Sequence, residues 1–180
     1  MKNAIFSFPL PANEPVKTYL KGSPEREVLE AELKKQSSQV IEIPLIIGGK
    51  EVRTGNTGTV VMPHDHRHVL ATYHKAGEKE VQMAIDAAMA AHKEWSELDW
   101  TVRATILLKI ADLIAGKYRA VINASTMLGQ SKNIYQAEID AACELIDFLR
   151  YNAHFAGKLY GFQPKSAPGQ INSVEYRALE

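Results

Sequence analysis

The longest amphipathic pattern in the sequence runs from Lys132 to Lys158. Apolar or small residues recur there every three or four positions, which is the period of one helix face. These residues are Ile134, Ala137, Ala141, Leu145, Phe148, Leu149, Phe155 and Ala156. The stretch contains no proline and a single glycine near its end. The pattern therefore predicts one helix, roughly 40 Å long at ~1.5 Å per residue.

The opposite face of this predicted helix is acidic. It carries Glu138, Asp140, Glu144 and Asp147. A row of charged residues opposite an apolar stripe is most simply a face in contact with water. The alternative is that one of these carboxylates lines a binding site, and the periodicity alone leaves both interpretations open.

The hydrophobic period changes to two between Ile43 and Lys75, which indicates a small β region. Gly48 and Gly49 separate two short apolar runs and predict a hairpin. Two further strands are predicted at 58–64 and 68–75, with a polar loop between them. The polar residues 36–42 before this region are predicted to form a linker.

Three more helices are predicted between Gly77 and Gly129. Asp99 is placed to cap the second of them, and Gly116 to end it in a left-handed conformation. The third covers about 118–128 and ends at Gly129. The apolar stripe of the first helix is Val81, Ala84, Ile85, Ala88 and Trp95, and that of the second is Val102, Ile106, Leu107, Ile110, Leu113 and Ile114.

The two ends of the chain carry weaker signals. Residues 1–22 are rich in proline and predict an extended arm. Ser23 followed by Pro24 predicts the start of a short helix that runs to about Lys35, with Val28, Leu29 and Leu33 facing inward. Residues 171–177 predict a last strand.

Composition excludes several classes of protein. Lys plus Arg and Asp plus Glu both number 21 in 180 residues, and a net charge of zero argues against nucleic acid or an anionic membrane as partner. The one cysteine, Cys143, excludes an internal disulfide.

No apolar run approaches the ~18 residues that span a bilayer. The N-terminal residues fit neither a signal peptide nor a mitochondrial presequence, so we expect a cytoplasmic protein.

Candidate chemistry is sparse. His64, His66 and His68 are a possible metal site, but no cysteine or carboxylate cluster completes a ligand shell, and a solvated loop is the simpler interpretation. Cys143 has an acidic neighbour, which raises a thiol pKa, so we expect a small buried residue and not a nucleophile. The sequence contains no GxGxxG, phosphate-loop, GxSxG or HExxH motif.

The predicted helices lack a surface to pack on. Helices with one apolar stripe usually pack on a sheet or in a bundle, and no large sheet is predicted. If the chain is part of a larger α/β protein, Leu107, Ile110, Ile114, Leu145 and Phe148 should be left uncovered. A free-standing helical module, which docks a basic partner on its acidic face, should instead enclose them.

The order of these segments resembles the N-terminal part of the aldehyde dehydrogenase superfamily, in which Trp95, Arg103, Leu107, Ala111 and Leu113 match helix positions. A closer resemblance is to the branch of Δ1-pyrroline-5-carboxylate dehydrogenases, which oxidise L-glutamate γ-semialdehyde. The segments that carry it are NEPV at 13–16, KGSPER at 21–26, MLGQSK at 127–132, QAEIDAACELIDFLRYNA at 136–153 and VEYRALE at 174–180.

The resemblance implies an α/β fold of which this chain is the N-terminal portion. Residues 1–42 would be an arm with a short helix, and 43–180 the start of the dehydrogenase domain. The NAD-binding sheet, catalytic cysteine, general-base glutamate and oligomerisation segment would lie downstream. The 180 residues would then hold no catalytic, cofactor or metal ligand, and would be inactive alone.

The resemblance also implies the reaction of the complete protein, a homo-oligomer of proline degradation in the cytoplasm or, alternatively, the mitochondrial matrix. A cysteine thiolate attacks the aldehyde, hydride passes to NAD, and activated water releases L-glutamate. Glu144 matches a position that lines the aldehyde tunnel, where a carboxylate suits the substrate's ammonium group. Asp140, one turn earlier, is a weaker candidate. An aldehyde dehydrogenase with another substrate is the alternative.

Overall fold

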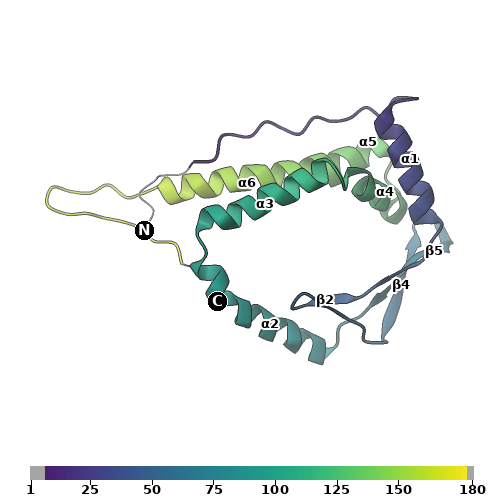
Figure 1. Ribbon diagram of the computed structural model, residues 1–180, viewed down its shortest axis with the longest axis horizontal. Coiled ribbons are helices and arrows are strands. Elements are labelled where there is room, and N and C mark those ends of the chain that lie inside the picture. The colour runs from purple at the N-terminus through teal and green to yellow at the C-terminus, as the bar shows by residue number, and fades with distance from the viewer. Residues whose placement is uncertain (1–6, 178–180) are drawn as a thin grey trace.

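The computed structural model describes residues 7–177 of the chain, which form a mixed α and β structure (Figure 1). Its helical elements are α1 (Pro24–Ser37), α2 (Glu78–Glu97), α3 (Trp100–Ala115), α4 (Arg119–Gln130), α5 (Ile134–Ala137), the π-helical segment η1 (Glu138–Cys143) and α6 (Glu144–Gly161). Its strands are β1 (Ile41–Ile43), β2 (Leu45–Ile47), β3 (Lys50–Val52), β4 (Thr57–Met62) and β5 (Asp65–His74). The fold class matches the prediction.

The long predicted helix is present, but it is not one regular α-helix. Asn133 caps α5 by accepting a hydrogen bond from the Gln136 backbone N–H. A π-helical segment then separates α5 from α6, and such a segment inserts one extra residue into the helical turn. As a consequence, Glu138 and Cys143 are both buried and face the same arginine, Arg119.

The predicted hairpin is confirmed as β2 and β3, which pair antiparallel across Gly48 and Gly49 with φ of 57° and 75°. The predicted strand pair is confirmed as β4 and β5. The linker prediction for residues 36–42 is partly wrong, because β1 pairs parallel with β5 and gives a sheet of order β1-β5-β4. Three residues are too few to show a period of two, so the pattern missed this strand.

Other local predictions had mixed outcomes. Asp99 caps α3 as predicted, accepting from the Thr101 N–H at 2.9 Å. Gly116 ends α3 with φ of −106°, so the left-handed prediction is wrong there. Helix α4 continues through Gly129, and its left-handed cap is Ser131 with φ of 55°. Residues 171–177 form no strand, so that prediction is wrong. The backbone of Val174 instead bonds the Gln163 side chain, through its N–H at 2.9 Å and its carbonyl oxygen at 3.2 Å.

Two small cores hold the helices together. Ala111 and Ile114 of α3 meet Ala142 of η1 and Ile146 of α6 in the first core. Tyr19 of the arm, Leu29 of α1 and Ala124 of α4 form the second. Leu29 is thus inside as predicted, and Leu33 packs against this second core, whereas Val28 is exposed. The arm and α1 pack on the later helices, while the predicted division at residue 42 stays a prediction.

The packing of α3 explains why most residues of its predicted apolar stripe are exposed to solvent. α3 lies against α6 (Figure 1), and it turns the small side chains Ala104 and Ala111 inward. Alanines let two helix backbones approach closely, so the bulky residues of α3 point elsewhere. Val102, Ile106, Leu107 and Ile110 are 36–42% exposed.

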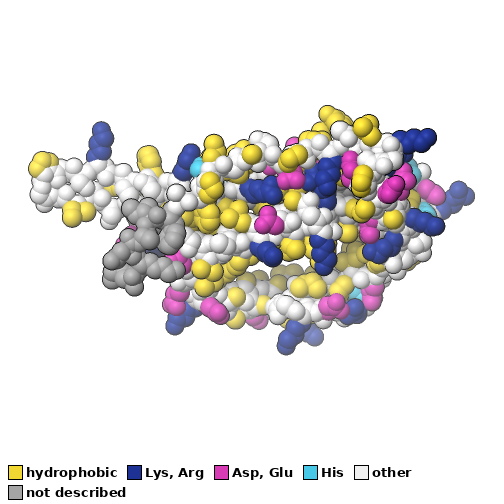
Figure 2. Space-filling view, turned by 45° about the horizontal axis from the view of Figure 1, so that its top comes forward, with side chains coloured by type: hydrophobic (Ala, Val, Ile, Leu, Met, Phe, Trp, Pro, Cys, Tyr) yellow, Lys and Arg dark blue, Asp and Glu magenta, His cyan; other side chains and the backbone are white. Residues whose placement is uncertain are grey.

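A broad apolar surface is therefore uncovered. Leu107, Ile110, Leu145 and Phe148 are 36–61% exposed, as predicted for a part of a larger protein, whereas Ile114 is buried and that detail of the prediction is wrong. Helix α2 has no buried residue at all. Figure 2 shows hydrophobic side chains at the surface between the charged ones. This exposure argues against a free-standing module. No described helix is long and apolar enough to span a bilayer.

Candidate functional site

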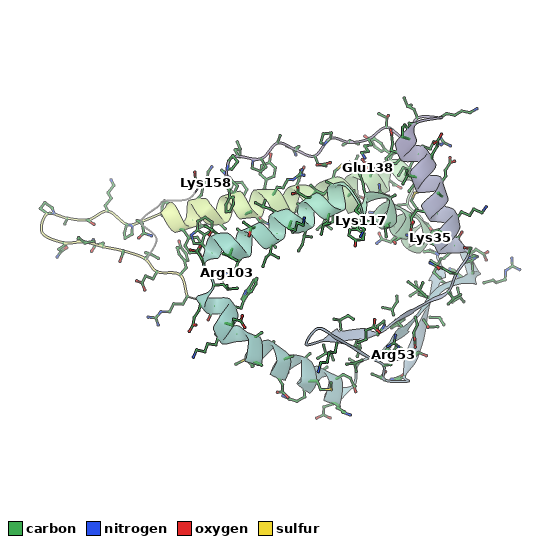
Figure 3. The ribbon with its side chains drawn as sticks, viewed as in Figure 1. Lys35, Arg53, Arg103, Lys117, Glu138 and Lys158 are labelled. Carbon is green, nitrogen blue, oxygen red and sulfur yellow. The ribbon has the colours of Figure 1, made fainter. Side chains whose placement is uncertain are left out.

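The four acidic residues of the long helix have four different surroundings. Glu138 is fully buried at the junction of α5 and η1 (Figure 3). The Arg119 guanidinium donates to it from Nη2 at 2.5 Å. Asn123 Nδ2 and Tyr19 Oη donate to its other oxygen, each at 2.8 Å. The backbone N–H of Lys17 completes the set at 2.8 Å. The prediction of a solvated face is wrong for this residue.

The charges in this cluster stabilise each other. Burial on its own raises the pKa of Glu138, but the hydrogen bonds from Arg119, Lys17, Asn123 and Tyr19 lower it below its usual value. Burial and the neighbouring Glu138 raise the pKa of Tyr19 to about 12. A buried carboxylate that accepts several hydrogen bonds and faces a guanidinium stays ionised. Glu138 is thus a structural anion at neutral pH.

A second carboxylate of the cluster comes from the arm. Glu14 bridges Arg119 at 2.5 Å and Arg150 of α6 at 2.6 Å. Burial raises its pKa, but the two arginines outweigh that effect and hold the pKa of Glu14 below its usual value. The arm is therefore attached to α4 and α6 by charge as well as by packing.

Asp147 of α6 also holds the arm. Its carboxylate accepts from the backbone N–H of Glu14 at 2.7 Å and from Asn13 Nδ2 at 2.9 Å. The prediction of a solvated face is wrong here too. We call the contacts of Glu14, Arg119, Glu138, Asp147 and Arg150 the arm clasp.

The remaining two carboxylates are exposed. Asp140 forms an ion pair with Lys132 at 2.5 Å. Glu144 is exposed, and no hydrogen bond or ion pair is found for it within residues 7–177. Its neighbours Leu145 and Phe148 are also exposed. Glu144 is thus an unpaired anion beside an apolar surface, which is an arrangement suited to a ligand with a cationic group.

Cys143 is buried as predicted, next to Arg119 of the arm clasp. Its thiol lies 3.3 Å from Arg119 Nη2. Burial, followed by the charge of Glu138, raises the pKa of Cys143 to about 11. A thiol with such a pKa is protonated at neutral pH and is a poor nucleophile.

Three of the histidines contact residues of other segments of the chain. His64 Nδ1 lies 2.7 Å from Ser131 Oγ, and His68 Nε2 lies 2.9 Å from the Ser37 carbonyl oxygen. Residues 65–68 belong to β5 and do not form the predicted loop. Buried His74 accepts on Nδ1 from the Thr54 N–H at 3.0 Å. Within residues 7–177, no three His, Cys, Asp or Glu side chains are grouped as metal ligands.

Sequence reasoning missed Arg119 and Glu14 as members of this cluster. Arg119 is the single charged residue of α4 and stands at its first position. A lone arginine in an otherwise uncharged helix can indicate a buried ion pair. Glu14 lies in the NEPV segment, which was singled out only for its resemblance. The distance of more than 100 residues between the two concealed the contact.

The described residues do not fit a dinucleotide. Rossmann-type sites need several parallel strands and a glycine-rich turn from a strand into a helix. Here the parallel pairing is limited to β1 with β5 in residues 7–177, and the sequence has no such glycine pattern.

Comparison with known proteins places this geometry in a family. Residues 51–179 match the aldehyde dehydrogenase family. A Δ1-pyrroline-5-carboxylate dehydrogenase of Agaricus bisporus is 49% identical over 98% of this chain and 33% of its own length. The human mitochondrial enzyme of that name is 47% identical over 94% of this chain and 30% of its own.

Solved structures agree. The Mycobacterium tuberculosis Δ-pyrroline-5-carboxylate dehydrogenase bound with NAD superimposes with a TM-score of 0.94 and 46% identity, over 98% of this chain and 33% of that one. The chain thus spans about a third of the length of the relatives that it matches. The chain belongs to the aldehyde dehydrogenase family.

Proposed function

We propose that this chain is the N-terminal third of a longer enzyme that oxidises L-glutamate γ-semialdehyde to L-glutamate with NAD, in proline degradation. The names of relatives at 46–49% identity support this substrate. The Mycobacterium tuberculosis relative, whose structure was solved with NAD bound, supports the cofactor. Since the described residues do not fit NAD, we assign its binding to the downstream part.

The observation that carries the proposal for this chain is the unpaired carboxylate of Glu144. Three of the four acidic side chains on the long helix are occupied by protein partners, and Glu144 is available. The substrate bears an ammonium group next to its carboxylate. A carboxylate placed at the wall of the substrate passage would bind that ammonium by a charge-assisted hydrogen bond, which orients the amino acid end of the aldehyde.

Steady-state kinetics of the longer enzyme test this role. Glu144→Ala should raise the KM for the semialdehyde and leave NAD affinity unchanged, because one charge-assisted contact contributes about 1.5–3 kcal/mol. Asp140→Asn is the matched control: it removes a carboxylate one turn away that is already paired with Lys132, and should change KM little. Unchanged kinetics in Glu144→Ala would remove Glu144 from the site.

Three further properties of the longer protein are part of the proposal. We infer a homo-oligomer that acts on a small molecule, with neither nucleic acid nor membrane as partner. The cytoplasm is the proposed compartment, with the mitochondrial matrix as the alternative, since the human and Dictyostelium relatives are named mitochondrial. Fractionation and size-exclusion measurements on the longer protein decide these points.

A further inference from the structure

Arg103 is a cation without an acidic partner in the described part of the chain. It lies near the start of α3 (Figure 3). A guanidinium has five N–H donors and is always charged. Its Nη2 donates to Tyr160 Oη at 3.4 Å, a long distance for a hydrogen bond, and its Nε is buried without a partner. Because buried donors nearly always have an acceptor, Arg103 needs one that residues 7–177 do not supply.

A cavity of about 260 Å³ adjoins this guanidinium. It lies where the end of α2, the start of α3 and the end of α6 meet. Its lining is Trp95, Trp100, Arg103, Ala104, Ile106, Leu107, Ala153, Ala156 and Tyr160. Arg103 is the one charged residue in this lining, so no carboxylate within the described chain neutralises it there.

The lining has the composition of a binding surface. Tryptophan, tyrosine and arginine are the residues most enriched among the energetically important contacts of protein interfaces. Trp100 stacks on Tyr160 with ring centroids 5.0 Å apart. Trp95 and Ile106 remain 47% and 42% exposed. An occupant that fits this cavity carries a carboxylate for the guanidinium fork and apolar groups for the exposed rings and aliphatic chains.

We propose that Arg103 and this cavity bind an acidic segment of the same polypeptide that lies beyond residue 180 in the longer enzyme. The proposal rests on the proposed function only in taking the chain as the first third of a longer protein. A matched structure three times as long superimposes with a TM-score of 0.94, so α2, α3 and α6 keep this arrangement when the rest of a dehydrogenase is present.

The position of the last described residues supports this choice of occupant. The Tyr176 ring packs against Tyr160 with centroids 5.5 Å apart, and Tyr160 lines the cavity. The described chain therefore ends next to a residue that lines the cavity. A second copy of the chain is the competing occupant. Cross-linking a mixture of isotope-labelled and unlabelled protein separates the two, because only a contact between copies gives mixed-label peptides, and that result would overturn the proposal.

Zero-length cross-linking of the longer protein tests the proposal. In Arg103→Lys, a carbodiimide should join the new amine to a carboxylate that it contacts, and peptide mass spectrometry should find an amide between position 103 and an acidic residue beyond 180. Exposed Lys109 of the same helix is the internal control for reactivity. An amide from position 103 to an acidic residue within the first 180 residues, in the same chain or a second copy, would overturn the proposal. So would the absence of any amide at 103 while Lys109 reacts.

A stability comparison gives an independent readout. Arg103→Met should lower the melting temperature of the longer protein, because the downstream carboxylate loses its cation. Arg53→Met is the matched control, since Arg53 is paired with Glu42 and Glu51 at the surface of this chain and its loss should change the melting temperature little. A melting temperature for Arg103→Met equal to that of Arg53→Met would contradict a downstream partner. Neither readout needs catalytic activity, so a failure of the proposed function does not affect the result.

Discussion

The two sides of the long helix use the same residue type for different purposes. On the side that faces the arm, the carboxylates of Glu138 and Asp147 are held by Arg119 and by backbone and side-chain donors of residues 13–19. On the open side, Glu144 has no partner within residues 7–177 and lies beside exposed Leu145 and Phe148. One side stabilises the fold, and the other is available for a ligand.

The difference shows what burial does to a charge. A carboxylate that loses water must gain partners of comparable strength, and the arm brings those partners from more than 100 residues away. An exposed carboxylate needs no such partner to stay ionised. The clasp side should therefore respond to mutation by losing stability, and the open side by losing ligand affinity.

The largest expected loss of stability follows from Arg119→Met. It leaves Glu138 buried with one charge unpaired and also removes one of the two arginine partners of Glu14. Breaking a buried pair from one side costs about 3–5 kcal/mol, which urea unfolding followed by circular dichroism measures. The double variant with Glu138→Leu should recover much of that loss. A cost below about 1 kcal/mol for Arg119→Met would mean that the clasp behaves as a surface ion pair.

A smaller loss is expected for Asp147→Ala. It removes two hydrogen bonds to a charged acceptor, together worth about 1.5–3 kcal/mol, and should free the arm from α6. Limited trypsin digestion should then cut after Lys17 faster than in the wild type. Asp140→Ala is the control on the exposed side, and equal rates in the two variants would show that Asp147 does not hold the arm.

The pH dependence gives the smallest of these effects. The folded pKa values of Glu14 and Glu138 lie below the ordinary value of 4.5. Their contribution is thus fully present above that pH and is lost as the pH falls through the folded values. Glu14→Gln removes one titrating group, so the slope of unfolding free energy against pH below about 4.5 should decrease by up to ~1.4 kcal/mol per pH unit. An unchanged slope would exclude Glu14 from the acid transition.

Much of the fold follows from local sequence. The hairpin at Gly48 and Gly49, the Asp99 cap and the long helix come from turn chemistry and periodicity, which act over a few residues. The π-helical segment, which turns Glu138 and Cys143 toward Arg119, does not, because periodicity and turn chemistry give no signal for its extra residue. The exposure of Leu107 and Ile110 on α3 is expected from the lack of a predicted sheet. The inward packing of Ala104 and Ala111 could not be predicted, because an alanine face packs inward only when a second helix approaches closely.

The candidate site divides in the same way. That four carboxylates lie on this one helix is plain from the sequence. Which carboxylate lacks a protein partner depends on the positions of Lys132, Arg119 and the arm. The contacts of Arg119 and of the arm join segments that are distant in sequence, and hydrophobic periodicity does not predict such contacts. The resemblance singled out Glu144, and the structure adds the physical reason that it is the carboxylate without a partner in residues 7–177.

The most direct test of this division is the substrate selectivity of the longer enzyme carrying Glu144→Gln. Selectivity is the kcat/KM for L-glutamate γ-semialdehyde divided by that for glutarate semialdehyde, which lacks the ammonium group. We expect this ratio to fall roughly 10- to 150-fold, the equivalent of about 1.5–3 kcal/mol, with melting temperature unchanged. A ratio equal to that of the wild type, or a loss of stability in its place, would contradict the assignment of Glu144 to the ligand side of the helix.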